Sequence, residues 1–266
     1  MTTADNAVPA AISALTQAAD PSWQPILMRG LQAVANADPG YLPRLLTEPY
    51  LPTDGRLFAA FRQPLDVVRY VLVGEGPYPR AASATGVCFM DGAVGSLWAP
   101  TGLSRQVNRA TSLRNFMKML LVANGRLYVE RTSGDALAHI GAAALAGSTG
   151  DINTLAQLQD NLLGQGFLLL NAALVFRPEV PPIREARGWQ PFLRTVLAAL
   201  KDHACDRGIA PPKLILWGKI AAQVDALPEA EGFPRAVSEH PYNLSFIGNR
   251  DMHALFEPMH LLSVAV

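Results

Sequence analysis

The stretch DVVRYVLVGEGPYP, residues 66–79, passes from an apolar run into a compact loop, and this pattern decides the fold. Its first part, 66–74, is short, apolar and rich in β-branched residues, which is typical of a buried strand. Three later runs share this character: GFLLLN (166–171), KLILWG (213–218) and PRAVSEH (234–240). The sequence therefore predicts four buried strands.

Helical periodicity fills the gaps between these runs. The clearest helical segments are 22–38, 112–125, 151–166 and 188–208, and the last three close at a glycine, as helices often do. Strands that alternate with helices indicate a parallel sheet covered on both faces. We expect an α/β protein, a three-layer α/β/α sandwich with a central four-stranded parallel sheet.

The remaining segments set the expected domain organisation. Residues 1–20 are rich in Ala and Thr and are predicted to be a flexible N-terminal tail. Residues 21–266 are predicted to form a single domain. The Gly- and Ala-rich stretch at about 124–150 shows little periodicity, so we interpret it as an insertion rather than a domain.

Composition limits the class of protein. Lys plus Arg equals Asp plus Glu at 22 each, so a nucleic-acid face would have to gather its charge locally. Two cysteines, Cys88 and Cys205, cannot supply a zinc site or a four-thiolate cluster, so we expect no metal and no cofactor. No signal peptide or membrane span is evident, and we expect a cytoplasmic monomer.

Polar residues follow the predicted strands at the edge where a ligand would bind. In open α/β sheets, ligands bind outside the carboxyl ends of the strands. The residues just beyond each run are Gly74–Pro79, Asn171, Gly218-Lys219 and 240–245. The sequence thus places a candidate site at this edge.

Each of these residues taken alone also has a structural explanation. Glycines after a strand permit a tight turn, an asparagine caps the next element, and His-Pro is a common turn. Taken alone, Phe89 is best interpreted as a core residue and Leu244 as an ordinary surface residue. Lys219 is best interpreted as a solvated residue at the start of a helix. Glu75 fits such an explanation least, because an acid held between a buried strand and a Gly-Pro loop needs donors or a shifted pKa.

Taken in order, the strand ends resemble the uracil-DNA glycosylase superfamily, and most closely its family 1. The segments that carry the resemblance are YLPTDGRLFAAF (50–61), VLVGEGPYPRAASATGVCF (71–89), SLRN (112–115), LLLNAAL (168–174), GW-x-x-F (188–192), LILWGKIA (214–221) and HPYNLS (240–245). One such segment is a weak signal, whereas the ordered set is a strong one. The resemblance implies a protein that flips deoxyuridine out of DNA and hydrolyses its N-glycosidic bond without a cofactor.

The resemblance also implies a role for each matched residue. Asn171 would read the Watson–Crick edge of the flipped uracil with its amide. Phe89 would stack on the base, and Tyr78 would fill the space beside C5 and so reject thymine. His240 would donate to uracil O2 as negative charge develops there. Leu244 would wedge into the gap that the base leaves.

The water-activating motif departs from the family pattern. Gly76 stands where family 1 carries an Asp that orients water and stabilises the cationic sugar, Glu75 replaces a Gln, and Pro79 replaces a His. GEGP also resembles the loop of the iron–sulfur family 4 enzymes, which lack that Asp but hold a four-cysteine cluster that this chain cannot supply. We expect Glu75 to act as the substitute water activator, with His240 as the second catalytic residue.

The predicted DNA contacts come from the same matched segments. Ser112, Lys219, Leu244 and Ser245 are expected to contact DNA. The proline-rich loop that precedes SL in the family is replaced by residues 91–111, which contain Trp98, Arg105 and Arg109. In the leucine segment, Tyr242 and Asn243 replace Ser and Pro.

Three functions follow from these residues. The first is a uracil-excising DNA glycosylase of base excision repair. The second is a catalytically weakened or inactive relative that binds DNA, which Gly76 favours because glycine cannot activate water. The third is a glycosylase for another deaminated base, such as hypoxanthine or xanthine, because an altered loop can alter the pocket.

Overall fold

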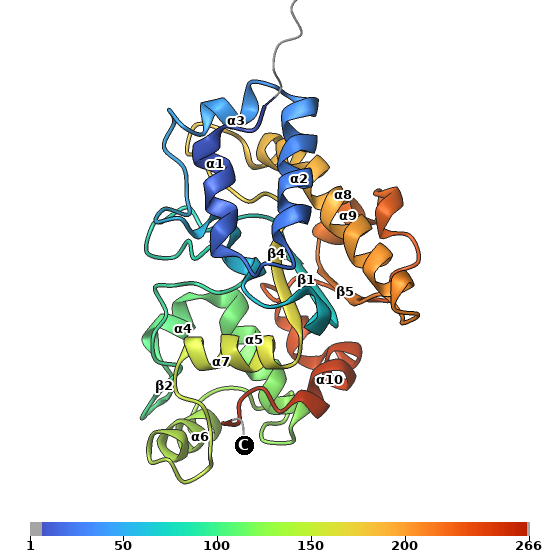
Figure 1. Ribbon diagram of the computed structural model, residues 1–266. Coiled ribbons are helices and arrows are strands. Elements are labelled where there is room, and N and C mark those ends of the chain that lie inside the picture. The colour runs from blue at the N-terminus through green and yellow to red at the C-terminus, as the bar shows by residue number, and fades with distance from the viewer. Residues whose placement is uncertain (1–6, 265–266) are drawn as a thin grey trace, which may run out of the picture. The chain divides into compact units, whose positions relative to one another are not determined.

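The computed structural model describes residues 7–264, and its centre is a four-stranded parallel sheet (Figure 1). The strand order is β4-β1-β5-β6. The strands are Phe167–Asn171 (β4), Tyr70–Gly74 (β1), Lys213–Trp217 (β5) and Arg235–Ser238 (β6). All four predicted strands are therefore present, and the predicted three-layer α/β class is confirmed.

Burial of the strands follows the apolar runs with one exception. β4 is buried along its whole length, and the middle of β1 is equally buried. β6, at one edge of the sheet, instead alternates between exposed and half-buried residues, whereas β4 at the other edge is buried. Residues 66–69, expected as part of the first strand, contain the 3₁₀ turn η3 (Leu65–Val67) and precede β1.

Contacts divide the chain into two compact units, each with its own core. The first unit comprises 1–88, 168–215 and 220–235, and the second comprises 89–167, 216–219 and 236–266. That residues 21–266 form a single domain stays a prediction.

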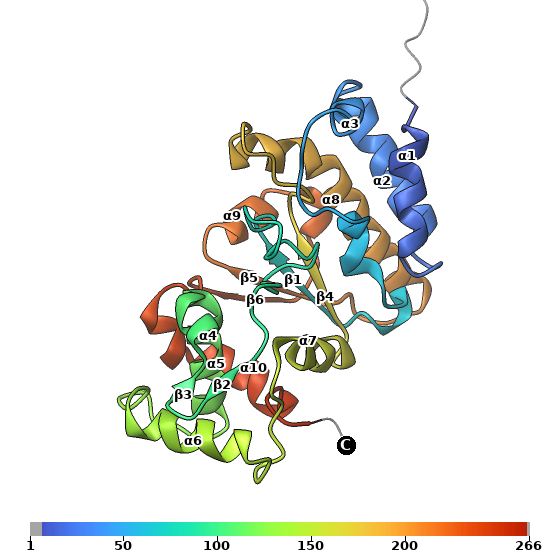
Figure 2. The ribbon, with the colours of Figure 1, turned by 90° about the vertical axis from the view of Figure 1, so that its left-hand side faces the viewer.

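The first unit is built on two long helices that pack side by side, α2 (Gln24–Ala37) and α8 (Pro182–Asp206) (Figures 1 and 2). Gly30 lets them approach, since a Cβ there would lie 2.6 Å from the Phe192 ring. The other elements are α1 (Ala10–Ala14), η1 (Leu15–Ala18), α3 (Tyr41–Arg44), η2 (Arg56–Phe61), α9 (Ile220–Asp225) and η4 (Pro228–Ala230). Stacked and edge-to-face aromatic pairs fill this core, in which Phe192 contacts Phe58, Phe61 and Trp189.

Part of the segment expected as a flexible tail is helical. α1 and η1 span residues 10–18, and they bury Ile12 and Thr16. The alanines of this segment favour helix, and burial of the Ile12 side chain holds the segment against the core. The expectation of a tail is wrong for residues 10–18, and residues 1–6 lie outside the described part of the chain.

The second unit contains the remaining helices. These are α4 (Arg105–Arg109), α5 (Thr111–Ala123), α6 (Asp135–Leu145), α7 (Leu155–Gly164), α10 (Arg250–Phe256), η5 (Leu244–Gly248) and η6 (Glu257–Met259). Helix α5 packs on η5 and α10. An aromatic core links them, because Trp217 contacts both Phe116 and Phe246.

The 124–150 segment contains one regular element, α6. It lies beside a short antiparallel hairpin, β2 (Trp98–Ala99) and β3 (Gly102–Leu103) (Figure 2). A Cβ at Gly141 would lie 2.4 Å from the Ala99 carbonyl oxygen, so only glycine permits this approach. Its many alanines favour helix formation. The segment lacks the amphipathic pattern from which a helix is predicted, so this helix was not expected. Among residues 7–264, no helix is both long and apolar enough to cross a membrane.

Candidate active site

Strands β1 and β4 lie side by side in the first unit and bring Gly74, Glu75 and Asn171 together. The backbone N–H of Ala172 donates to the Gly74 carbonyl at 2.8 Å, and that of Ala173 donates to the Glu75 carbonyl at 3.1 Å. These bonds continue the pairing beyond both strand ends. The loop after β1 and the residue that ends β4 are thus held by backbone geometry.

Gly74 is required for packing against Asn171. A Cβ at position 74 would lie 2.8 Å from Asn171 Oδ1 and 2.9 Å from Cys88 Cβ. Gly74 is not among the glycines with positive φ, so its backbone conformation does not require glycine, whereas its packing does. The absent side chain makes room for the Asn171 amide.

Asn171, the last residue of β4, has a side chain without a hydrogen-bond partner. It is 4% exposed, and its side-chain amide makes no hydrogen bond within residues 7–264. The amide atoms of Asn171 are not among the fully buried polar atoms that lack a partner, so solvent can reach them. An unpaired amide that is open to solvent on an otherwise buried side chain is suited to a ligand that offers a donor and an acceptor.

The rest of the 74–79 loop is more open. Glu75 and Gly76 are exposed and Tyr78 is half-buried. Glu75 is therefore not confined between strand and loop as its sequence position suggested, and its carboxylate is free to approach water. A Cβ at Gly76 would meet nothing closer than Ala173, at 3.6 Å.

Phe89 in the second unit adopts a strained backbone conformation. Its φ is +66°, a region that bulky side chains rarely occupy and that clusters at functional sites. Its ring is half-buried and makes edge-to-face contacts with Phe116 and Trp217, with centroids 5.3 and 5.1 Å away. The ring orientation is therefore held from the side of the core.

His240 follows β6 and packs on Gly218, which follows β5. A Cβ at Gly218 would lie 2.9 Å from His240 Cβ, and Gly218 has a φ of +70°, so only glycine fits there. The backbone N–H of Tyr242 donates to His240 Nδ1 at 3.1 Å. Because Nδ1 accepts, neutral His240 carries its proton on Nε2 and can donate from that atom.

Asn115 anchors the loop after His240, a role that sequence analysis missed. It is fully buried in α5, and its Nδ2 group donates to the carbonyl of Pro241 at 2.7 Å. Longer contacts reach the carbonyls of Tyr242 and Asn243, at 3.3 and 3.4 Å. Asn115 is the last residue of the SLRN segment, so the sequence did mark this position. An asparagine in a helix nevertheless gives no reason to expect a hydrogen bond to a residue 126 positions away.

The same loop presents Leu244 and Tyr242 at the surface. They are 69% and 68% exposed, as a wedge residue would be. Ser245 is exposed but hydrogen-bonds to Glu239. Burial opposes ionisation of Glu239, yet hydrogen bonds from Ser245 and Asn249 hold its pKa below the usual range. The Ser245 hydroxyl is thus shared with a carboxylate.

The other predicted DNA contacts lie apart from this loop in sequence. Lys219 is exposed and Ser112 is half-buried in the first turn of α5. Arg105 and Arg109 are exposed on one face of α4, and neither has an acceptor within the described residues. Trp98 is 3% exposed and donates to the Ile152 carbonyl at 2.7 Å, so it is a core residue.

The structure thus assembles two sets of residues, one in each unit. Gly74, Glu75 and Asn171 meet in the first. In the second, Phe89 contacts Trp217, and the next residue, Gly218, contacts His240.

Comparison with known proteins identifies the family. A uracil-DNA glycosylase of Thermobifida fusca is 30% identical over 206 residues, which cover 76% of this chain and 71% of that protein. One from Mycobacterium tuberculosis is 29% identical over 205 residues, with 76% and 72% covered. A solved glycosylase structure of this type, from Nitratifractor salsuginis, is 39% identical, covers 96% of both chains and has a TM-score of 0.84.

The chain belongs to the uracil-DNA glycosylase family. No protein-family model matches it. At position 76 this member has a glycine, which brings no functional group to the loop. Asn171 and Cys88 both lie against Gly74.

Proposed function

We propose that this chain excises uracil from DNA by hydrolysing the N-glycosidic bond. Water adds to C1′ of the deoxyribose, the C1′–N1 bond breaks, and the products are free uracil and an abasic site. The observation that supports this proposal most directly is the unpartnered amide on the buried side chain of Asn171. Membership of the family supplies the substrate class.

Asn171 and His240 recognise uracil and stabilise it as a leaving group. The Asn171 amide donates to uracil O4 and accepts from N3–H, which pairs both of its unused polar atoms. His240 donates from Nε2 to uracil O2, where negative charge develops as the bond to the sugar breaks. The hydrogen bond at Nδ1 supports this role, because it holds the proton on Nε2.

Phe89 and Tyr78 select the base by shape. The Phe89 ring stacks on uracil, and its edge-to-face contacts keep it oriented before DNA arrives. Tyr78 excludes thymine by a clash with the C5 methyl group, which requires no new hydrogen bond.

Glu75 takes the place of the missing Asp as the group that orients water. Its exposure and the lack of a described partner for its carboxylate support this assignment. A general base contributes roughly 10²–10⁴ in rate, which is less than glycosylases achieve in total, so Asn171 and His240 alone would still give measurable activity.

DNA is held by the second unit. Leu244 enters the gap in the duplex, and Tyr242 offers a second exposed apolar side chain beside it. Ser112, Ser245 and Lys219 contact the backbone, and the unpaired guanidinium groups of α4 add phosphate contacts. We place the protein in the cytoplasm as a monomer without a cofactor.

Single-turnover incubation tests the proposal. Excess protein is mixed with end-labelled DNA carrying one uracil, in single- and double-stranded form, and abasic sites are cleaved with alkali. Asn171→Ala is expected to abolish cleavage, and Glu75→Gln to lower its rate by roughly 10²–10⁴. Asn36→Ala, an exposed asparagine bonded to Gln32, serves as the matched control with unchanged rate. Full activity of Glu75→Gln would remove Glu75 as the base.

A second candidate is a relative that binds uracil-containing DNA without cleaving it. Gly76 favours it, because the strongest water-activating group of the family is absent. Retained gel-shift binding without release of uracil, even at high protein excess, would support this candidate over the enzyme. A substrate panel with hypoxanthine and xanthine then tests the third possibility.

A further inference from the structure

A cleft of about 670 Å³ in the first unit carries an excess of positive charge. It lies where α2 ends, at α3, and at the start of α8. Its charged lining consists of Arg44, Arg177, Arg184, Arg187, Asp38 and Glu48, a net charge of +2. None of the residues predicted for uracil recognition lines it.

The floor of the cleft is a buried polar network. The Tyr41 hydroxyl donates to one oxygen of Glu185, and Arg177 Nε donates to the other at 2.6 Å. Arg177 Nη1 donates to Glu48 at 2.6 Å. Arg177 and Glu185 are 6% and 2% exposed, so this network is fixed. Gly188 lets α8 approach it, since a Cβ there would lie 2.6 Å from the Tyr41 ring.

The two acids of the lining are already neutralised. Glu48 pairs with Arg177, and Asp38 pairs with Arg44 at 2.6 Å. Arg184 and Arg187 are exposed, and neither has an acceptor within residues 7–264. The excess charge of the cleft therefore resides on these two residues of α8.

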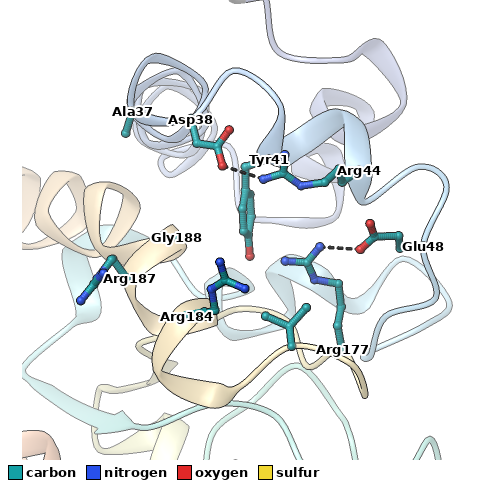
Figure 3. A pocket seen from close by; sticks show the side chains of 10 residues that line it. Ala37, Asp38, Tyr41, Arg44, Glu48, Arg177, Arg184, Arg187 and Gly188 are labelled. Carbon is teal, nitrogen blue, oxygen red and sulfur yellow. Dashed lines mark hydrogen bonds and ion pairs between the residues drawn. The ribbon is translucent and has the colours of Figure 1, made fainter.

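Arg177 and Arg184 point into the cleft from different elements, whereas Arg187 lies at its far edge (Figure 3). The Nε and Nη1 groups of Arg177 donate to the carboxylates of Glu185 and Glu48, and its Nη2 group has no acceptor among the described residues. Two guanidinium groups directed at one space repel each other unless an anion lies between them. Both keep donors free for the forked geometry that binds phosphate oxygens.

We propose that this cleft binds a phosphomonoester, with Arg184 and the Nη2 group of Arg177 as its ligands. A phosphomonoester offers three terminal oxygens to these two guanidinium groups, whereas a phosphodiester offers only two. The volume is that of a small-molecule site. The Tyr41 ring is 4% exposed and offers no stacking surface, so the cleft recognises the phosphate rather than a base.

Thermal unfolding of the full chain with added inorganic phosphate tests the site, with chloride balancing ionic strength. We expect a saturable rise in Tm, and an apparent affinity at least about tenfold weaker in Arg184→Gln, because one of two charged ligands is lost. Arg29→Gln removes an exposed arginine of α2 and is the matched control, with affinity unchanged. No saturable rise, or equal affinity in Arg184→Gln, would overturn the proposal.

Two further ligands identify the source of the phosphate. A nucleoside monophosphate represents a soluble ligand, and a 5′-phosphorylated oligonucleotide without uracil, compared with its 5′-hydroxyl form, represents a DNA end. A difference between wild type and Arg184→Gln for either ligand supports the site and names its source. Equal binding of the phosphorylated and hydroxyl forms, together with no effect of the nucleotide, contradicts it. Excision of uracil enters neither measurement.

Discussion

Gly74 and Gly76 stand two positions apart, yet the structure gives them opposite tolerance for a side chain. A Cβ at Gly74 would collide with Asn171 and Cys88 at 2.8 and 2.9 Å, whereas at Gly76 the nearest atoms are 3.6 Å away. Neither has positive φ. The difference in tolerance between the two positions therefore comes from packing and not from backbone conformation.

Gly74→Ala is expected to displace the Asn171 amide and lower the single-turnover rate of uracil release by about 10²-fold, the usual cost of a misplaced group. Gly76→Ala is its matched control and is expected to change the rate by less than about threefold, as an exposed substitution does. Urea unfolding checks that both variants fold. Equal rates for the two would show that Gly74 does not position Asn171.

Gly76→Asp is expected to raise the single-turnover rate, because it adds a carboxylate at the proposed water-activating position; the gain stays below the roughly 10²–10⁴ of a general base, since Glu75 already supplies one. The backbone accepts a side chain there and the nearest neighbour, Ala173, is in ordinary contact. Gly76→Asn has the same size without the charge and is expected to stay near the wild-type rate. Identical rates for the two variants would argue against a carboxylate role at this position.

At the scale of elements, helix α5 controls the loop that follows β6. Asn115 of α5 donates to the carbonyls of residues 241–243, and the backbone of that loop in turn donates to His240 Nδ1. One buried amide thus supports both the orientation of His240 and the start of η5, where Leu244 is exposed.

Asn115→Ala is expected to lower the free energy of unfolding by about 1–3 kcal/mol, because the loop carbonyls lose their donor. It should also reduce excision from double-stranded DNA more than from single-stranded DNA, since only the duplex needs Leu244 as a wedge. Asn108→Ala is the control, because Asn108 of α4 likewise donates to a carbonyl, that of Leu103, at 2.8 Å. An unchanged ratio of the two rates in Asn115→Ala would contradict the positioning role.

At the scale of the whole molecule, the curated relatives and the solved structure match different fractions of this chain. The curated relatives align with 76% of it, whereas the N. salsuginis structure covers 96%. The match to the solved structure therefore extends beyond the part of the chain that aligns with the curated relatives. Helix α6 of the 124–150 segment packs on the β2–β3 hairpin.

Stability of the folded chain should depend on alkaline pH through Cys88. Burial raises the pKa of the Cys88 thiol, so the folded chain keeps a proton that the unfolded chain loses above about pH 8.5. Its contribution to stability is complete below that pH and is lost as pH rises toward the folded pKa, by up to about 1.4 kcal/mol per pH unit.

Urea unfolding of wild type and Cys88→Ala between neutral pH and about pH 10 measures this dependence. The stability advantage of wild type over Cys88→Ala should shrink above pH 8.5, because all other titrating groups are common to both proteins. Cys205 is exposed, and Cys205→Ala is the control for removal of a thiol outside the core. A constant difference for Cys88→Ala would show that its thiol ionises equally in both states.

The sequence by itself determined the strands, the four main helices and the edge of the sheet that bears the candidate residues. These follow from local rules, since apolar runs bury and 3.6-residue periodicity forms helices, and no distant contact is needed. The ordered motifs also led to the glycosylase family, which the comparisons confirm. The same rules did not predict the helix in residues 10–18, because Ile12 is the only buried apolar residue there and gives no periodic pattern.

Only the tertiary structure decided which residues act together. The need for glycine at 74, the bond from Asn115 to the 241–243 loop, and the burial of Trp98 join positions that are far apart in sequence. The arginine cleft joins Tyr41 to Glu185 across 144 positions. Such contacts arise from packing between elements, which a linear pattern does not encode, whereas the elements themselves arise from neighbours along the chain.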